Sequence, residues 1–230
     1  MVDRWLWGPY RGVVLYGIDV RMALSDTEQQ LFNAALTHFA RHGKAGARMQ
    51  AIADAAGINK AMLHYYFRSK DALYEAVFAH ATRQFMASFD TALASATTFA
   101  EGLRFFIDGY ITFCRRHTAA MRLMVNENLR GGSLVGEHLE RLNATAEDAP
   151  QQLMLRSIEQ AMARGEIRPV NPHHTLLSIV SACLFPFMAR PTAEVLHPDA
   201  GSWDAFLEAR KEHLFDLLYH GLCTNAPATP

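Results

Sequence analysis

The segment spanning residues 48–67 constrains the fold more than any other part of this 230-residue chain. Met49, Ile52 and Ala53 recur at the spacing of one helix face, which predicts a short first helix. Gly57 follows and supplies the backbone freedom that a sharp turn between helices requires. The segment therefore predicts a helical pair joined by a tight turn.

The second helix of the pair begins after Asn59, a favourable N-cap residue. Leu63 and Phe67 sit four residues apart and can anchor it inward. This arrangement predicts a helix-turn-helix, whose second helix enters the major groove of DNA; the alternative is an ordinary helical hairpin in an all-α core. The candidate DNA-binding residues are Arg48, Asn59, Lys60, Ala61, Met62, His64, Tyr65, Tyr66 and Lys70.

The flanking sequence agrees with this interpretation. Ser25 and Glu28 form a capping box, and the helical apolar spacing that follows continues to Gly43. Ser69 can cap the next helix. Lys70, at that helix N-terminus, would sit where backbone N–H groups and an ammonium can hold a phosphate together. A three-helix head followed by a long helix is predicted.

Residues 25–78 resemble the DNA-binding domain of the tetracycline-repressor (TetR) family of bacterial regulators. This resemblance implies a double-stranded DNA operator, a homodimer and a small-molecule effector as partners. The resembling residues are Ala34-Ala35-Leu36, Phe39-Ala40, Gly43, Ile52-Ala53, Ala56-Gly57, Lys60, Leu63, Tyr66-Phe67, Ser69-Lys70, Leu73 and Ala76-Val77.

The sequence departs from the family pattern within the second short helix. Met62 stands where the family has a hydroxyl residue, and His64 precedes Tyr65 where the family has the reverse order. Met62 cannot donate a hydrogen bond to a phosphate, but it can contact a thymine methyl group in the major groove. Phosphate contact is therefore expected, while the base preference stays open.

Charge and composition are consistent with one end that faces nucleic acid. Residues 1–70 hold nine Lys and Arg against five Asp and Glu, a balance of +4, which leaves −5 for the remainder of a chain of net charge −1. Three widely spaced cysteines predict reduced thiols rather than disulfides or a zinc site. No apolar run approaches the ~20 residues that span a bilayer. We expect a cytoplasmic protein with no membrane association, metal or other cofactor.

The chain divides by its patterns into an extension, a head, a body and a tail. The extension, 1–24, resembles neither a helix nor a signal peptide. One hypothesis is that translation begins at Met22; the alternative is a mobile basic arm that reaches DNA. The head is 25–70, the helical ligand-binding and dimerisation body is 71–222, and the tail is 223–230.

The body is predicted to be a helical bundle, which makes the whole chain all-α. A long helix is expected to run from Asp71 to about Leu93, and a second capping box joins Thr98 to Glu101. Further helices are expected over 134–147, from Pro150 to Gly165, from Pro172 to Ala189, and from Trp203 to Leu222.

The helix beginning at Pro172 has almost no polar face, so it must be covered on all sides. A second subunit is the expected cover; the alternative is a core helix of a monomer. The family resemblance implies that the final two long helices pair with those of a partner. The expected interface residues are Leu177, Val180, Leu184, Leu214, Leu217 and Leu218.

The body also carries aromatic and methionine residues at helical spacing, which could line a cavity for a small, largely apolar effector. The alternative is ordinary core packing. Pro186 is expected to kink its helix and widen such a cavity, and Asn126 and Glu127 are candidate polar groups. The expected pocket residues are Phe106, Tyr110, Phe113, His117, Met121, Met124, Phe185 and Met188.

Enzymatic motifs are absent from the sequence. It has no glycine-rich phosphate loop, no nucleophile elbow and no zinc-protease helix. His38 and His42 lie four residues apart but lack a further ligand for a metal. The predicted function is a ligand-responsive repressor that binds a pseudo-palindromic operator as a dimer. The alternative is an all-α small-molecule-binding or catalytic bundle with a vestigial helix-turn-helix.

Overall fold

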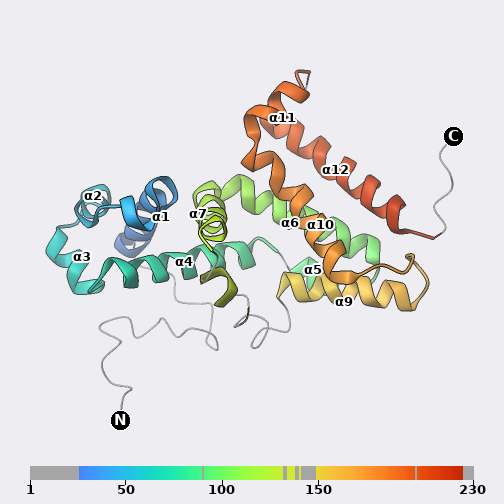
Figure 1. Ribbon diagram of the computed structural model, residues 1–230, viewed down its shortest axis with the longest axis horizontal. Coiled ribbons are helices and arrows are strands. Elements are labelled where there is room, and N and C mark those ends of the chain that lie inside the picture. Colours follow the sequence, from blue (N-terminus) through green and yellow to red (C-terminus); the bar gives the residue numbers. More distant parts are fainter. Residues whose placement is uncertain are drawn as a thin grey trace, which may run out of the picture. The chain divides into compact units, whose positions relative to one another are not determined.

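The computed structural model describes residues 26–89, 91–131, 134–137, 140, 149–199 and 201–224, and its named elements within them are all α-helices (Figure 1). The all-α prediction is confirmed. The helices are α1 (Asp26–Gly46), α2 (Met49–Ala55), α3 (Lys60–Tyr66), α4 (Lys70–Ala87), α5 (Thr91–Ser95), α6 (Phe99–Arg116), α7 (Thr118–Leu129), α9 (Pro150–Ala163), α10 (Pro172–Met188), α11 (Arg190–Leu196) and α12 (Trp203–Leu222).

The chain folds into two compact units. The first contains Met1–Thr82 and Ala119–Arg141, and the second contains Arg83–Thr118 and Leu142–Pro230. Helix α4 passes from one unit to the other, and α7 belongs to the first unit. The division therefore falls later than the head boundary expected at residue 70, because the first part of α4 is buried within the head.

The first unit is built around side chains that α1, α2, α3 and α4 bury together. Leu31, Ile52, Leu63 and Leu73 each have 1% or less of their surface exposed. Burying a side chain of this size contributes roughly 1.5–3 kcal/mol. At Gly43 the regular helix of α1 is interrupted, since this residue has φ 66° and ψ 175°. The predicted stop signal thus acts one turn before the helix ends.

The second unit is organised around α6, which packs against α9, α10 and α12. The predicted capping box at its start is confirmed: the Glu101 N–H donates to Thr98 Oγ1, and the Thr98 N–H donates to the Glu101 carboxylate, both over 3.2 Å. Farther along α6, a Cβ at Gly109 would stand 2.7 Å from the ring of Phe89. Glycine here allows the end of α4 to approach α6 closely.

Helices α10 and α12 form an antiparallel pair in the second unit, as Figure 1 shows. Helix α10 begins as predicted, with Asn171 as its N-cap and Pro172 at its first position. Pro186, where a kink is expected, lies inside α10, and the chain makes a 90° turn between α10 and α11, after Met188. In the described residues, no single helix is long and apolar enough to cross a membrane, and only the bent pair of α10 and α11 meets both criteria together.

Other sequence predictions meet the structure with different results. The long helix expected to reach Leu93 ends at Ala87, and α5 follows it as a separate short helix. The helices predicted from Pro150 and from Trp203 are confirmed. The 1–24 extension, the side chains of the Ser25–Glu28 capping box, most of 134–147 and most of the tail lie outside the described residues.

Candidate nucleic-acid interface

Helices α2 and α3 form the predicted helical pair. Gly57 occupies the turn between them with a φ of 68°, a conformation that side-chain-bearing residues rarely adopt. Asn59 caps α3, because its side-chain oxygen accepts a 2.7 Å hydrogen bond from the Met62 N–H. Arg48 occupies the N-cap position of α2 and makes no side-chain cap hydrogen bond there. A guanidinium has no acceptor for the free N–H groups there, and Arg48 is an exposed residue.

Helix α3 has one buried side and one open side. Leu63 is fully buried and Phe67, just after the helix, is nearly so, which confirms both predicted anchors. Met62 is 42% exposed and Tyr65 is 71% exposed. The exposed candidates on or beside this helix are Asn59, Lys60, Ala61, Met62, His64 and Tyr65. Tyr66 is half-buried, and its ring meets that of Tyr65 edge-on at 5.8 Å.

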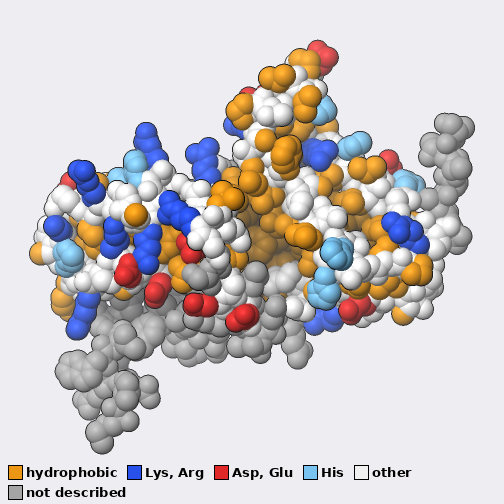
Figure 2. Space-filling view, viewed as in Figure 1, with side chains coloured by type: hydrophobic (Ala, Val, Ile, Leu, Met, Phe, Trp, Pro, Cys, Tyr) orange, Lys and Arg blue, Asp and Glu red, His pale blue; other side chains and the backbone are white. Residues whose placement is uncertain are grey.

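Positive charge accompanies this open side. Arg41, Arg48, Lys60 and Arg68 are exposed residues of the first unit, and Figure 2 shows Lys and Arg side chains gathered over α1, α2 and α3. The exposed side chains of Met62 and Tyr65 thus lie on a basic surface. This combination suits a DNA groove, where cations contact phosphates and apolar groups contact bases.

Lys70 has partners within the protein. Its ammonium donates to the carbonyl oxygens of Ala45, at 3.0 Å, and Ala47, at 3.3 Å. It therefore fixes the connection between α1 and α2 to the start of α4, where Ser69 is the predicted N-cap and accepts from the Ala72 N–H. The structure gives Lys70 a positioning role that the sequence pattern did not reveal.

An aromatic cluster lies in the second unit, where α6 meets the end of α4. The Phe85 ring contacts those of Tyr110 and Phe113 edge-on at 5.6 and 5.1 Å, and the ring of Phe113 stacks on that of His117 at 5.9 Å. Burial raises the pKa of the Tyr110 hydroxyl. Burial, aided by the neighbouring Arg116, lowers the pKa of His117. The polar groups of this cluster are consequently neutral at pH 7.

Only half of the residues expected to line a pocket belong to this cluster. Phe106, Tyr110, Phe113 and His117 do, together with Phe85 and Phe89, which sequence reasoning missed. Met121 and Met124 lie on α7, in the first unit. Phe185 and Met188 lie on the surface of the second unit, 57% and 52% exposed. The described structure brings four of the eight residues together in the second unit.

Comparisons with known proteins agree with this architecture. Residues 31–77 match the family model of "Bacterial regulatory proteins, tetR family", and residues 100–218 match that of the "Tetracyclin repressor-like, C-terminal domain". The second match alone covers more than half of the chain. The protein belongs to the TetR family.

Curated relatives in the TetR family are transcriptional regulators. The HTH-type transcriptional regulator RutR of Escherichia coli K12 is 30% identical over 163 residues, which are 68% of this chain and 72% of RutR. The HTH-type transcriptional repressor NicS of Pseudomonas putida is 30% identical over 168 residues, 69% of this chain and 74% of NicS. The protein is accordingly a DNA-binding transcriptional regulator and not an enzyme.

Solved structures show the same TetR-type fold. A transcriptional regulator of Streptomyces coelicolor, SCO4942, superposes with a TM-score of 0.65 at 23% identity and covers 85% of this chain and 98% of its own. The ketosteroid transcriptional regulator KstR2 of Mycobacterium tuberculosis superposes with a TM-score of 0.68 at 17% identity and covers 89% and 98%. At these identities the likeness supports the fold alone.

Helix α7 contributes polar contacts to the TetR-type head that the sequence did not suggest. Asn126 donates a 3.0 Å hydrogen bond to the carbonyl of Ala40, and Glu127 accepts a 2.8 Å hydrogen bond from the hydroxyl of Tyr74. The guanidinium of Arg130 occupies the space where a Cβ would stand on Gly43. Asn126 and Glu127, expected as polar groups of an effector pocket, hold α7 to α1 and α4.

The variants Lys60→Ala and Lys70→Ala are expected to differ in their effects on DNA binding and on the stability of the head. Lys60→Ala removes an exposed cation, so the slope of log affinity against log salt should fall by about one, with the free energy of unfolding unchanged. Lys70→Ala removes the two hydrogen bonds to the Ala45 and Ala47 carbonyls and should destabilise the head by ~0.5–1.5 kcal/mol. Salt titrations of DNA binding and denaturant unfolding separate the two effects. An unchanged slope for Lys60→Ala would contradict its contact with phosphate.

Tyr74→Phe is expected to change how stability depends on alkaline pH. Burial and the hydrogen bond to Glu127 raise the pKa of Tyr74 in the folded state above the unfolded value of about 10. The contribution of the neutral Tyr74 hydroxyl to the free energy of unfolding is fully present below pH ~10. It is lost as pH rises toward the folded pKa, at up to ~1.4 kcal/mol per pH unit. The variant should be less stable at neutral pH and lose stability less steeply above pH 10 in denaturant titrations. Tyr65→Phe, at an exposed ring, is the matched control, and equal slopes in both variants would refute the role of Tyr74.

Proposed function

We propose that this protein is a homodimeric repressor that reads a pseudo-palindromic operator with two copies of α3 and leaves it when a small, uncharged effector binds the second unit. One observation carries the proposal. Helix α3 is anchored by Leu63 from beneath, while its outward side presents Lys60, Met62 and Tyr65. A helix in this setting can enter the major groove without any rearrangement of its own core.

The dimer is supported by the outward side of the α10 and α12 pair. Leu177 and Leu217 are 61% and 59% exposed in the single subunit, while Val180, Leu184 and Leu218 are half-buried. Exposed leucines clustered on adjoining helices are typical of a protein interface. Leu214, also expected at the interface, is only 1% exposed and packs inside its own subunit, so its contribution to a dimer would be indirect.

The effector class is supported by the aromatic cluster around Tyr110. Its rings offer apolar surface, and its polar groups, Tyr110 and His117, are neutral at pH 7. Apolar walls with uncharged polar groups favour an uncharged, largely apolar molecule. A ligand that prefers a subunit conformation in which the two α3 helices are wrongly spaced would lower DNA affinity by its differential preference, commonly ~1–3 kcal/mol.

Selection of bound fragments from the source genome with the full-length protein tests this function. The expected product is a pseudo-palindrome whose half-sites are separated by one helical turn or a multiple of it. Affinity for that fragment should fall steeply with salt, since phosphate contacts release counterions. A protein that enriches no sequence and binds random DNA without salt dependence would instead fit the bundle with a vestigial helix-turn-helix. Such a regulator acts where the chromosome lies, in the cytoplasm.

A further inference from the structure

Helix α10 presents a face that is uncharged over its whole length. Its sequence from Pro172 to Met188 contains no Lys, Arg, Asp or Glu. Ile179 and Cys183 point into the subunit and are fully buried, whereas Leu177, Phe185 and Met188 are each more than half exposed. The exposed three fall on one side of a helix with 3.6 residues per turn. We call this side, with Ser181 between them, the α10 stripe.

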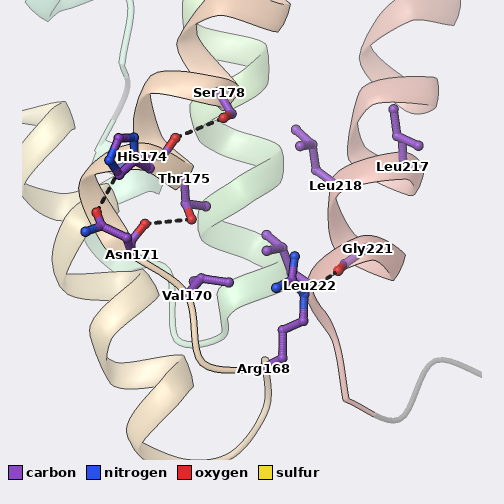
Figure 3. Close-up of a pocket in the computed structure, with 10 residues that line it drawn as sticks. All are labelled: Arg168, Val170, Asn171, His174, Thr175, Ser178, Leu217, Leu218, Gly221 and Leu222. Carbon is purple, nitrogen blue, oxygen red and sulfur yellow. Dashed lines mark hydrogen bonds between the residues drawn. The ribbon is translucent and has the colours of Figure 1, made fainter.

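A groove adjoins the first half of this stripe. It has a volume of about 410 Å³ and lies where the start of α10 meets the end of α12 (Figure 3). Arg168 shapes one end, because its Nε donates a 3.0 Å hydrogen bond to the Gly221 carbonyl. The groove is lined by Arg168, Val170, Asn171, His174, Thr175, Ser178, Leu217, Leu218, Gly221 and Leu222.

The polar side chains that line the groove from α10 are largely occupied within their own helix. Thr175 and Ser178 donate to the carbonyls four residues earlier, and the Asn171 side-chain oxygen accepts from the His174 N–H. Leu217 and Leu218 supply apolar wall from α12. A groove of this kind accepts a large apolar side chain without leaving the hydroxyls of Thr175 and Ser178 unpaired.

The same face therefore carries both a groove and exposed side chains able to fill one. They lie at different places along α10: the groove centres near Thr175, and Phe185 projects roughly 15 Å farther along, at 1.5 Å per residue. In a two-fold dimer every contact between two different residues occurs twice, once in each direction. A projecting side chain of each subunit can therefore enter the groove of the other. The axis must then pass midway, beside Ser181.

The residue at that midpoint suits a close approach of two helices. Ser181 is small and exposed, and its hydroxyl donates a 2.7 Å hydrogen bond to the Leu177 carbonyl of its own helix. It therefore presents little bulk and no unsatisfied donor to a partner helix. Ser178, one turn earlier, is arranged in the same way.

We propose that in the homodimer the two α10 helices cross beside Ser181, and that Phe185 of each subunit fills the groove between α10 and α12 of the other. This inference rests on the proposed dimer and specifies its register. A lipid surface is the competing occupant, since α10 and α11 together have the length and composition of a bent membrane segment.

Disulfide trapping tests the crossing point. Ser181→Cys in the full-length protein should link to its own copy under mild oxidation, giving covalent dimers on a non-reducing gel. Ala163→Cys, an exposed small residue on α9, is the matched control and should stay unlinked, as should the wild-type protein with its three cysteines. Equal linking of Ser181→Cys and Ala163→Cys, or none in either, would overturn the crossing.

Truncation of the projecting ring tests the groove. Phe185→Ala should raise the dimer dissociation constant by on the order of a hundredfold or more, because both copies lose a central aromatic anchor. Val195→Ala removes a similarly exposed apolar side chain from α11 and should leave that constant unchanged. Analytical ultracentrifugation measures both, and an unchanged constant for Phe185→Ala would overturn the proposal.

The two levels of the proposal fail in different ways. A wild-type dimer in which Ser181→Cys stays unlinked and Phe185→Ala has no effect leaves the dimer intact and removes only this register. A wild-type protein that is monomeric at micromolar concentration removes both. Flotation of the wild-type protein with phosphatidylcholine–phosphatidylglycerol vesicles, lost in Phe185→Ala, would assign the α10 stripe to lipid and overturn the inference.

Discussion

Replacing Leu63 with alanine is expected to lower the free energy of unfolding of the DNA-binding head by ~2–5 kcal/mol and to abolish operator binding. Leu63 is fully buried beneath α3. The shortened side chain would leave a cavity at the contact that fixes the orientation of α3 within the head. A loss of this size is a large fraction of the stability of a small domain. Denaturant unfolding and gel-shift titration measure the two effects.

Met62→Ala is the matched control for that experiment. Its side chain belongs to the same helix but is 42% exposed, so its removal should change stability by less than ~0.5 kcal/mol. Binding to random DNA should be retained, while preference for thymine at one operator position weakens. Near-normal stability in Leu63→Ala would show that α3 is not held by this anchor, and the assignment of α3 as a recognition helix would fail with it.

The features of the head that could be predicted from sequence are local ones. Capping by Asn59, the turn at Gly57 and the inward anchors Leu63 and Phe67 each depend on residues within one or two helical turns. Each feature requires only residues that are close in sequence. These are a side-chain oxygen ahead of free N–H groups, a residue tolerant of positive φ, and apolar residues spaced four apart. All of them are present in the structure.

The roles that could not be predicted depend on partners distant in sequence. Lys70 is predicted from its place at a helix start to contact phosphate, and the structure adds that its ammonium donates to the Ala45 and Ala47 carbonyls. Tyr74 and Glu127 are 53 residues apart and no periodicity connects them. Contacts of this kind arise from how helices pack, which hydrophobic patterns determine only coarsely.

Helix α10 shows the same limit from the other direction. Its composition predicted burial on all sides, and the single subunit buries only the side that carries Ile179 and Cys183. An apolar composition predicts that a helix is buried, but it does not indicate whether the same chain or another chain buries it. For Phe185, grouped by sequence with pocket residues, the structure gives an outward position.

Replacing Leu177 with glutamate is expected to convert the protein to monomers and to lower operator affinity by at least on the order of a hundredfold. Leu177 is 61% exposed in the single subunit, so the change should not disturb the subunit's own core. In a two-fold interface each substitution occurs twice, and each copy would bring a carboxylate into an apolar contact, where an unpaired charge is costly. A monomer meets the operator with one α3 and loses the contacts of the second half-site.

Leu129→Glu separates this effect from a general response to added charge. Leu129 is 75% exposed and lies on α7 in the first unit, so this variant should remain dimeric and stable. Light scattering reports the mass, and the unfolding free energy of each variant confirms that its subunit is folded. Binding to random DNA should persist in both variants, because the basic surface of each head is unchanged. A Leu177→Glu protein that keeps the wild-type mass and operator affinity would exclude α10 from the dimer contact and require another surface to set the spacing of the two recognition helices.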